Sequence, residues 1–184
     1  MTTRNIRLLD DVCFKLIKHA MDIAVKAHAD VNHFYDGKPY CIHLQAVYSF
    51  GLKWAYLLKG SELVKAQVLS ALWVHDLPED ARWSYNDVLL EFGEAVADLA
   101  FAVTNNTGKT RKEKADSAYY KKIRNTENAD FVKLCDRLGN VWYGLQFGGS
   151  MYRKYQSEQQ EFKKQLYNPN LQPMWDELDE MLKY

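Results

Sequence analysis

Apolar side chains recur at intervals of three and four residues along almost the whole chain of 184 residues. This spacing gathers them on one face of an α-helix, whereas the sequence lacks the sustained alternation of apolar and polar residues that indicates a strand. The pattern therefore predicts an all-α protein with no strands. The predicted helices cover residues 6–32, 41–58, 62–76, 84–91, 93–104, 114–125, 128–147, 150–166 and 173–183.

Local signals at several helix ends support this prediction. Ser61 and Ser84 stand where N-caps are expected, and Asp87 follows Ser84 at the spacing of a capping box. Pro173 suits the first turn of the last helix, where its missing N–H costs nothing. The polar stretch 104–116 has no apolar face and is rich in turn residues, so we expect a loop there.

A run that is apolar nearly all round, residues 63–74, predicts a buried helix, and His75 and Asp76 follow directly at its end. Burying such polar groups without partners costs roughly 2–7 kcal/mol each, and more for a charge. A metal ion would supply the missing partner. Because neighbouring helical residues point about 100° apart, other segments must complete the site, and His43 and Asp136 are the candidates. Two imidazoles and two carboxylates suit manganese, zinc, iron or magnesium.

The next two acidic residues, Glu79 and Asp80, stand at a spacing expected of catalytic carboxylates beside such a metal. With the candidate ligands they make a hydrolase the leading hypothesis. Two structural alternatives stay open. Glu79 and Asp80 could form a solvated acidic turn after Pro78, and Asp136 could form an ordinary exposed ion pair with Arg137.

The predicted helix 128–147 carries a polar stripe beside its apolar face, formed by Asp136, Gly139, Asn140 and Tyr143. Glycine inside a helix costs about 1 kcal/mol relative to alanine. Gly139 therefore indicates close approach by another group. That group could be a ligand or a neighbouring helix, and the sequence leaves both open.

The composition limits the classes of partner that the protein is expected to bind. The formal net charge is zero, so no overall field favours nucleic acid or an anionic membrane, while a local basic patch could still bind a phosphorylated small molecule. The three cysteines, Cys13, Cys41 and Cys135, have no CxxC spacing, which is typical of reduced thiols in a cytosolic protein. No apolar stretch reaches the roughly 18 residues of a membrane span, and no secretory segment is evident. We expect a cytoplasmic protein of one domain, and its oligomeric state stays open.

Five stretches, taken in order, carry a resemblance to a known family: AH at 27–28, GKPYCIH at 37–43, HDLPED at 75–80, VT at 103–104 and KLCDRLGN at 133–140. A lone His-Asp dipeptide is a weak signal, but the combination is specific. It resembles the HD superfamily of metal-dependent phosphohydrolases, and more narrowly the hydrolase domain of RelA/SpoT-type enzymes and the stand-alone small alarmone hydrolases. The resemblance covers about residues 8–145. It implies a single HD-type helical bundle over 1–184, with helices in 150–183 packing on the motif region.

The resemblance also implies a mechanism. The ligands of one manganese ion would be His43, His75, Asp76 and Asp136. Glu79 and Asp80 would orient or deprotonate the attacking water. The family reaction removes pyrophosphate from the 3′ ribose position of guanosine tetra- or pentaphosphate, and some members act on the adenosine counterparts. A bound metal ion lowers the pKa of water to near 7 and polarises the phosphorus–oxygen bond.

For the substrate, the resemblance implies that Asn140 contacts the nucleotide, and Tyr143 on the same stripe is a further candidate. Alarmone hydrolases usually carry an Arg-Lys pair ahead of the position of Gly37, whereas this chain has NHFYD at 32–36. The rings of His33, Phe34 and Tyr35 are candidates to stack on a purine, and stacking does not distinguish guanine from adenine. Gly139 stands where a histidine is common in the family, which would enlarge the pocket.

The loop at 104–116 offers positive charge in place of the missing pair. Its candidates for phosphate binding are Lys109, Arg111 and Lys112. Arg111 comes first, because a planar guanidinium matches phosphate oxygens better than an ammonium group. A simply solvated charge cluster is the alternative interpretation.

Three functions are therefore compared. The first is hydrolysis of the 3′-pyrophosphate of (p)ppGpp or (p)ppApp through a metal-activated water. The second is an HD-type phosphatase or 5′-nucleotidase on another nucleotide, which would release orthophosphate instead of pyrophosphate. The third is a non-catalytic nucleotide-binding module, which loss of a metal ligand would favour. The first function is preferred, because the chain is about the size of one small hydrolase domain and the order of its motifs matches that branch of the family. The third is the least favoured, because the motifs keep every ligand position.

Overall fold

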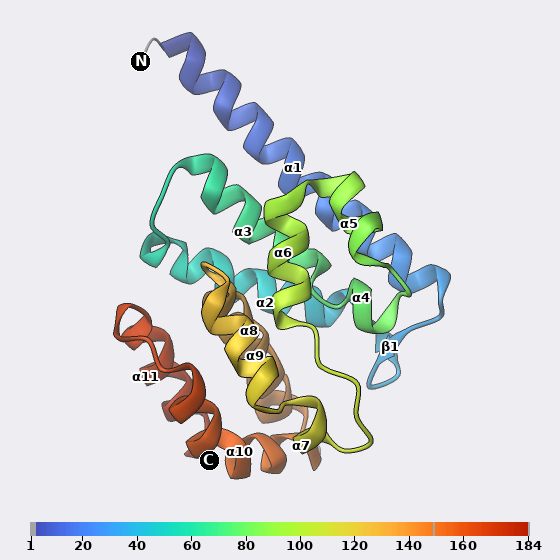
Figure 1. The fold of residues 1–184 in the computed structure, drawn as a ribbon, viewed down its shortest axis with the longest axis vertical. Helices are drawn as coiled ribbons and strands as arrows, with labels where there is room; N and C mark the ends of the chain where they lie inside the picture. Colours follow the sequence, from blue (N-terminus) through green and yellow to red (C-terminus); the bar gives the residue numbers. More distant parts are fainter. Residues whose placement is uncertain (1–2, 149, 184) are drawn as a thin grey trace.

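The structure is a computed structural model that describes residues 3–148 and 150–183, with side chains for 10–111, 113–148 and 151–183. The elements follow one another as α1 (Thr3–Asp30), β1 (Phe34–Tyr35), β2 (Lys38–Pro39), α2 (Cys41–Trp54), η1 (Ala55–Leu57), α3 (Glu62–Val74), α4 (Leu77–Asp80), α5 (Tyr85–Phe92), α6 (Glu94–Val103), α7 (Arg111–Lys114), α8 (Ser117–Asn125), α9 (Ala129–Phe147), α10 (Ser150–Leu166), η2 (Pro169–Leu171) and α11 (Gln172–Met181). The all-α prediction is confirmed (Figure 1).

The prediction that the chain has no strands is wrong in one place. Phe34 pairs with Pro39 and Tyr35 with Lys38 in a two-stranded antiparallel hairpin. Its turn residues, Asp36 and Gly37, both have positive φ, at 51° and 72°. Asp-Gly at the tip of a two-residue turn is a strong hairpin signal, but strands of two residues are too short to show an alternating pattern.

The predicted helix ends are largely confirmed. Ser61 accepts a hydrogen bond from the backbone N–H of Val64, and Ser84 and Asp87 form a complete capping box. Pro173 lies in the first turn of α11. The predicted helix 62–76 instead ends at Val74, because a separate turn of helix, α4, begins at Leu77 and leaves His75 and Asp76 at the junction. A second short helix, α7, interrupts the predicted loop 104–116.

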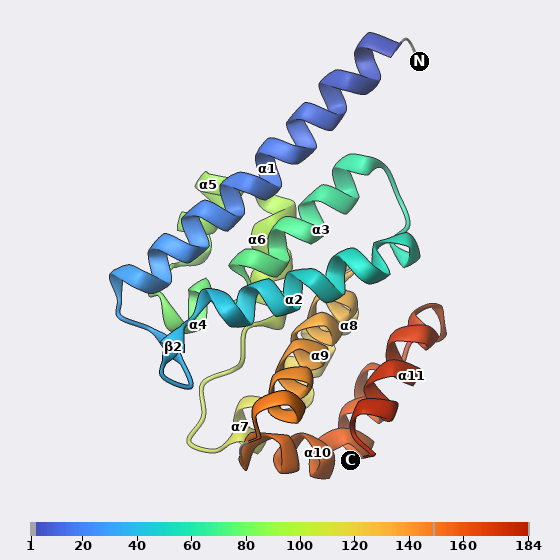
Figure 2. The same ribbon diagram turned by 180° about the vertical axis from the view of Figure 1, so that it is seen from behind.

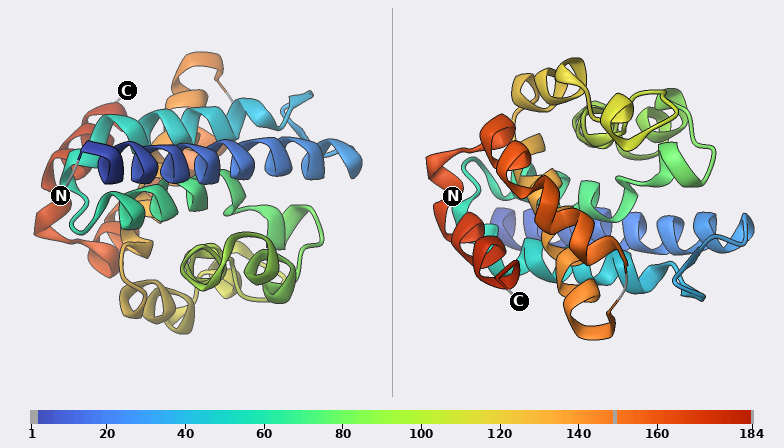
Figure 3. Two further views of the ribbon diagram at one scale, coloured as in Figure 1. Left: turned by 90° about the horizontal axis from the view of Figure 1, so that it is seen from above. Right: turned by 90° about the horizontal axis from the view of Figure 1, so that it is seen from below.

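Two central helices organise the core. Helix α3 packs against α1, α2 and α6, and its residues from Val68 to Val74 are all buried. Helix α9 packs against α2, α3, α6 and α8 on one side and receives α10 and α11 on the other (Figures 1 and 2). Seen from above, α1, α2 and α3 run side by side across the view (Figure 3, left). Because α2 packs on both central helices, it carries side chains to the place where α3 and α9 meet.

The amino-terminal part of α1 extends beyond the rest of the bundle (Figures 1 and 2). Among the described helices, none is both long enough and apolar enough to span a bilayer.

Candidate metal centre and cleft

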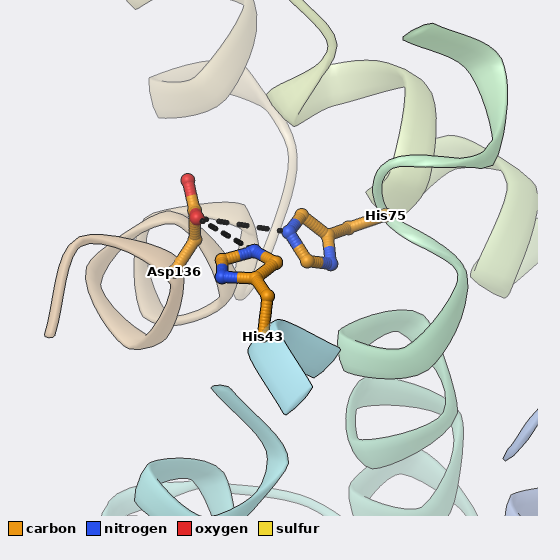
Figure 4. Close-up of side chains that lie close together, drawn as sticks. All are labelled: His43, His75 and Asp136. Atoms are coloured by element: carbon orange, nitrogen blue, oxygen red, sulfur yellow. Dashed lines mark ion pairs between the residues drawn. The ribbon is translucent and has the colours of Figure 1, made fainter. Parts of the chain in front are cut away.

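The four predicted metal ligands lie together, although they come from three separate parts of the chain. His43 is in the first turn of α2, His75 and Asp76 form the junction between α3 and α4, and Asp136 is in the middle of α9. The His43 Nε2 atom lies 3.2 Å from Asp76 Oδ2 and 3.5 Å from Asp136 Oδ1. The His75 Nε2 atom lies 3.0 Å from Asp76 Oδ2 and 3.7 Å from Asp136 Oδ1. Figure 4 shows His43 and His75 turned toward the Asp136 carboxylate.

The protonation of the His75 ring suits a metal ligand. Its Nδ1 lies 3.0 Å from the carbonyl oxygen of Leu72, and since a carbonyl only accepts, Nδ1 carries the proton. That leaves Nε2, which faces the two carboxylates, as the ring atom that a metal ion would take, an arrangement typical of metal-binding histidines. His75 Nε2 is buried and has no hydrogen bond of good geometry. Ligand atoms of His43, His75 and Asp136 all lie within 4.8 Å of one another. The residues therefore fit a divalent cation.

The electrostatics of the cluster favour a positive charge at its centre. Burial alone would lower the pKa of His75, but the neighbouring carboxylates of Asp76 and Asp136 raise it to about 10. Burial opposes ionisation of the two carboxylates as well. Even so, the positive charge of His75 holds the pKa of Asp76 well below its usual range, and the charge of Lys133 does the same for Asp136. The two carboxylates are therefore ionised, and they carry the negative charge that a divalent cation would neutralise.

The cluster opens onto a cleft of about 1060 Å³. Helices α8, α9 and α10 and the 104–116 segment supply most of its wall. The cationic side chains in that wall are Arg111, Lys114, Lys133 and Arg137. His43, Asp76 and Asp136 lie in the same wall. Metal ligands and phosphate-compatible cations thus share one cavity large enough for a nucleotide-sized ligand.

The two predicted catalytic carboxylates differ in their surroundings. Glu79 lines the cleft. Its carboxylate accepts two hydrogen bonds from Asn105, one from the backbone N at 2.7 Å and one from the side-chain Nδ2 at 2.9 Å. Asp80 keeps an exposed side chain, yet desolvation of its carboxylate and the nearby charge of Asp76 raise its pKa to about 6. A pKa near neutrality is the property expected of a proton acceptor.

Asn140 supports the metal site from α9. Its side-chain amide donates to Asp136 Oδ1 at 2.6 Å, and its own Oδ1 accepts from the Tyr35 hydroxyl at 2.7 Å. Asn140 also lines the cleft. Tyr143 points elsewhere, because its hydroxyl donates to Asp36 and accepts from Lys38.

Gly139 packs against a neighbouring helix. A Cβ at this position would lie 3.0 Å from Val47 Cγ2 and 3.2 Å from the Val47 backbone N. Of the two alternatives for this glycine, close helix packing is therefore correct, and the expected enlargement of the pocket is not found because α2 fills the space.

The predicted phosphate-binding residues differ in their position relative to the cleft. Arg111 lines the cleft and makes two hydrogen bonds to Glu158, at 2.9 and 3.0 Å. Lys109 is exposed and is not among the residues found to line the cleft. The side chain of Lys112 lies outside the described residues.

The predicted stacking residues lie around the hairpin rather than in the cleft wall. His33 lies 3.0 Å from His28, Nδ1 to Nδ1, and its ring packs on Tyr40. Phe34 is 57% exposed. Tyr35 packs on the His43 ring with centroids 5.0 Å apart. Purine stacking by these residues stays a prediction.

Sequence reasoning missed three residues of the site. The side chain of Lys133 is 15% exposed and pairs with Asp136 at 2.9 Å, a contact that their spacing of three on one helix could have indicated. Arg137 lies over the rings of Tyr155 and Phe162 and pairs with Glu158 at 3.2 Å. The alternative of an Asp136–Arg137 ion pair is therefore wrong. Tyr40, the third, donates to Asp76.

Comparisons with known proteins give a relative in sequence and a solved structure with a similar fold. A scan against protein-family profiles finds no match. The chain is 33% identical over 129 residues to a guanosine-3′,5′-bis(diphosphate) 3′-pyrophosphohydrolase of Aquifex aeolicus (strain VF5), an alignment that covers 68% of this chain and 17% of that relative. The chain therefore spans only a minor part of the relative's length.

A solved structure shares the fold. It belongs to a metazoan ortholog of SpoT, described as hydrolysing ppGpp and playing a role in starvation responses. It superposes with a TM-score of 0.66 at 23% identity, over 90% of this chain and 94% of that one. Sequence and fold, together with the converging His-Asp cluster, identify the chain as an HD-type domain of the RelA/SpoT hydrolase-like kind.

Proposed function

We propose that this protein is a metal-dependent nucleotide pyrophosphohydrolase that removes the 3′-pyrophosphate of (p)ppGpp or (p)ppApp-type alarmones. The observation that carries the proposal is the His-Asp cluster at the floor of a cleft whose wall bears four cationic side chains. The relative in Aquifex aeolicus is a 3′-pyrophosphohydrolase of guanosine-3′,5′-bis(diphosphate), which supports the same reaction here.

The proposal assigns one metal ion, Mn²⁺, to His43, His75, Asp76 and Asp136. Two imidazole nitrogens and two carboxylates are a donor set that manganese accepts. When bound, the metal supplies Lewis acidity toward the phosphate oxygens and lowers the pKa of water. The support from this chain is the unpaired Nε2 of His75 and its hydrogen bond from Nδ1 to Leu72, which fixes the ring tautomer.

Glu79 and Asp80 are assigned to the attacking water. Asn105 fixes the Glu79 carboxylate with two hydrogen bonds, so Glu79 is oriented to hold the water. Asp80, with its pKa raised to about 6 by desolvation and by Asp76, is the better proton acceptor of the two near neutral pH.

The substrate's phosphates are assigned to the cationic wall of the cleft. Arg111 presents a guanidinium that is half exposed, so phosphate oxygens can reach it, and Asn140 borders the same cavity. The rings of His33, Phe34 and Tyr35 are assigned to stack on the purine, and Tyr35 lies beside the metal cluster because it packs on the His43 ring. The free cysteines support the proposed cytoplasmic location.

The test is to incubate the manganese-loaded protein with guanosine and adenosine 3′-pyrophosphate nucleotides and with a set of 5′-monophosphates, resolving the products by anion exchange. We expect release of pyrophosphate from the 3′ position. The turnover of the guanosine nucleotide relative to the adenosine nucleotide gives the base preference. The Asp76→Ala variant is the control for contaminating activity. Orthophosphate from 5′-monophosphates alone would overturn the proposal in favour of a nucleotidase.

A further inference from the structure

Tyr40 is a buried residue whose hydroxyl reaches a metal-ligand carboxylate. It stands at the N-cap of α2, directly after the hairpin and three residues before His43. Its side chain is 8% exposed, and its hydroxyl donates to Asp76 Oδ2 at 2.5 Å. A short hydrogen bond from a hydroxyl to a carboxylate is among the stronger hydrogen bonds in proteins.

The oxygen that accepts this bond is the one that faces both imidazoles. Asp76 Oδ2 lies 3.2 Å from His43 Nε2 and 3.0 Å from His75 Nε2. With a cation held by Nε2, the His75 ring would keep its one proton on Nδ1, where it bonds Leu72, and would have no proton to donate to Asp76. The Tyr40 phenol is then the donor that fixes the carboxylate's rotation.

Two imidazole rings hold the phenol in place. The rings of His28 and His33 stack on Tyr40 with centroid distances of 4.2 and 4.0 Å. A phenol keeps its proton at neutral pH and an ionised carboxylate only accepts, so the Tyr40 hydroxyl is the donor in the bond to Asp76.

We propose that Tyr40 is a positioning residue for the metal: its hydroxyl orients the Asp76 carboxylate toward the cation held between His43 and His75. This inference rests on the proposed metal site. Partners that hydrogen-bond a ligand fix its orientation, and removing one typically weakens metal binding about 10–100-fold. The hairpin before α2 then has a role, because it places Tyr40 beside Asp76. The two rings that stack on Tyr40 come from α1 (His28) and from the chain just before the hairpin (His33).

The test compares Tyr40→Phe with a matched variant, Tyr143→Phe. Both tyrosines are buried, and each change removes one hydroxyl and keeps the ring. The Tyr143 hydroxyl bonds Asp36 and Lys38 and no metal ligand. The affinity of each purified protein for Mn²⁺ alone is measured by isothermal titration calorimetry, and the unfolding free energy of each metal-free protein is measured in urea.

We expect Tyr40→Phe to bind Mn²⁺ about 10–100-fold more weakly than wild type and Tyr143→Phe to bind it as wild type does. Equal Mn²⁺ affinity in wild type and Tyr40→Phe would overturn the inference while leaving the proposed function intact. Equal losses of affinity in the two variants would also overturn it, because a general loosening of the fold would then account for the effect. A wild-type protein that binds no divalent metal would overturn the proposed function itself, and the inference with it.

Discussion

Replacing Gly139 by alanine tests how closely α2 must approach α9. The added Cβ would lie 3.0 Å from Val47 Cγ2, 3.2 Å from the Val47 backbone N and 3.4 Å from its Cα. A side-chain methyl can move by rotation, but a backbone nitrogen moves only with its helix. Alanine therefore forces α2 and α9 apart by a few tenths of an ångström.

Two opposing effects set the size of the change. Replacing glycine by alanine in a helix interior raises the free energy of unfolding by about 1 kcal/mol. Overpacking a tight interior lowers it by about 1–3 kcal/mol. Since two of the three close contacts are to backbone atoms, the cost belongs in the upper part of that range. We expect a net loss of about 1 kcal/mol in the free energy of unfolding.

The same change should reach the metal site. Val47 lies one turn after His43 on α2, and Gly139 lies one turn after Asp136 on α9, so the forced separation falls one turn from the contact of 3.5 Å between His43 Nε2 and Asp136 Oδ1. Mn²⁺ affinity should therefore fall together with stability. Urea denaturation of the metal-free protein and calorimetric titration with Mn²⁺ measure the two effects separately.

A double-mutant cycle provides the control. Val47→Ala removes the methyl that meets the new Cβ, so adding it to Gly139→Ala should cost less than the two single losses together. A Gly139→Ala protein that is as stable as wild type, or more stable, would refute the reasoning, because helix propensity would then outweigh the close approach. Strict additivity in the cycle would show that the new Cβ does not meet the side chain of Val47.

Three further predictions concern chemistry and pH. Asp76→Ala should abolish Mn²⁺ binding and turnover together, whereas Glu79→Ala should keep the metal and lose kcat; normal turnover in Glu79→Ala would remove that residue from the mechanism. Arg111→Ala should raise KM for a 3′-pyrophosphate nucleotide. It should change the free energy of unfolding by less than about 1 kcal/mol, because the ion pair of Arg111 is half exposed. An unchanged KM would mean that Arg111 is simply solvated and does not bind the substrate. His28 has its pKa lowered to about 4 by burial. The unfolded state therefore binds more protons as pH falls from about 6.5 toward 4, and the free energy of unfolding decreases over that window. His28→Gln should flatten this decrease in urea unfolding measured at several pH values, and an identical slope would contradict the assignment.

The sequence by itself determined what depends on neighbours in the chain. Helix periodicity and the capping serines Ser61 and Ser84 act within one or two turns, so the pattern predicts them correctly. That His75 and Asp76 need partners was also predictable, because they end a buried apolar run, although the predicted helix ran on to Asp76 whereas α3 ends at Val74. The motif order then identified the kind of domain.

Tertiary structure decided what depends on segments far apart in sequence. The Tyr40 hydroxyl reaches Asp76 across 36 positions, and Arg111 reaches Glu158 across 47. No local pattern encodes such contacts, because they follow from the packing of whole helices and hairpins. Gly139 shows the division most clearly: the sequence indicated close approach, and only the packing of α2 on α9 showed that Val47, a helix neighbour, is the group that approaches.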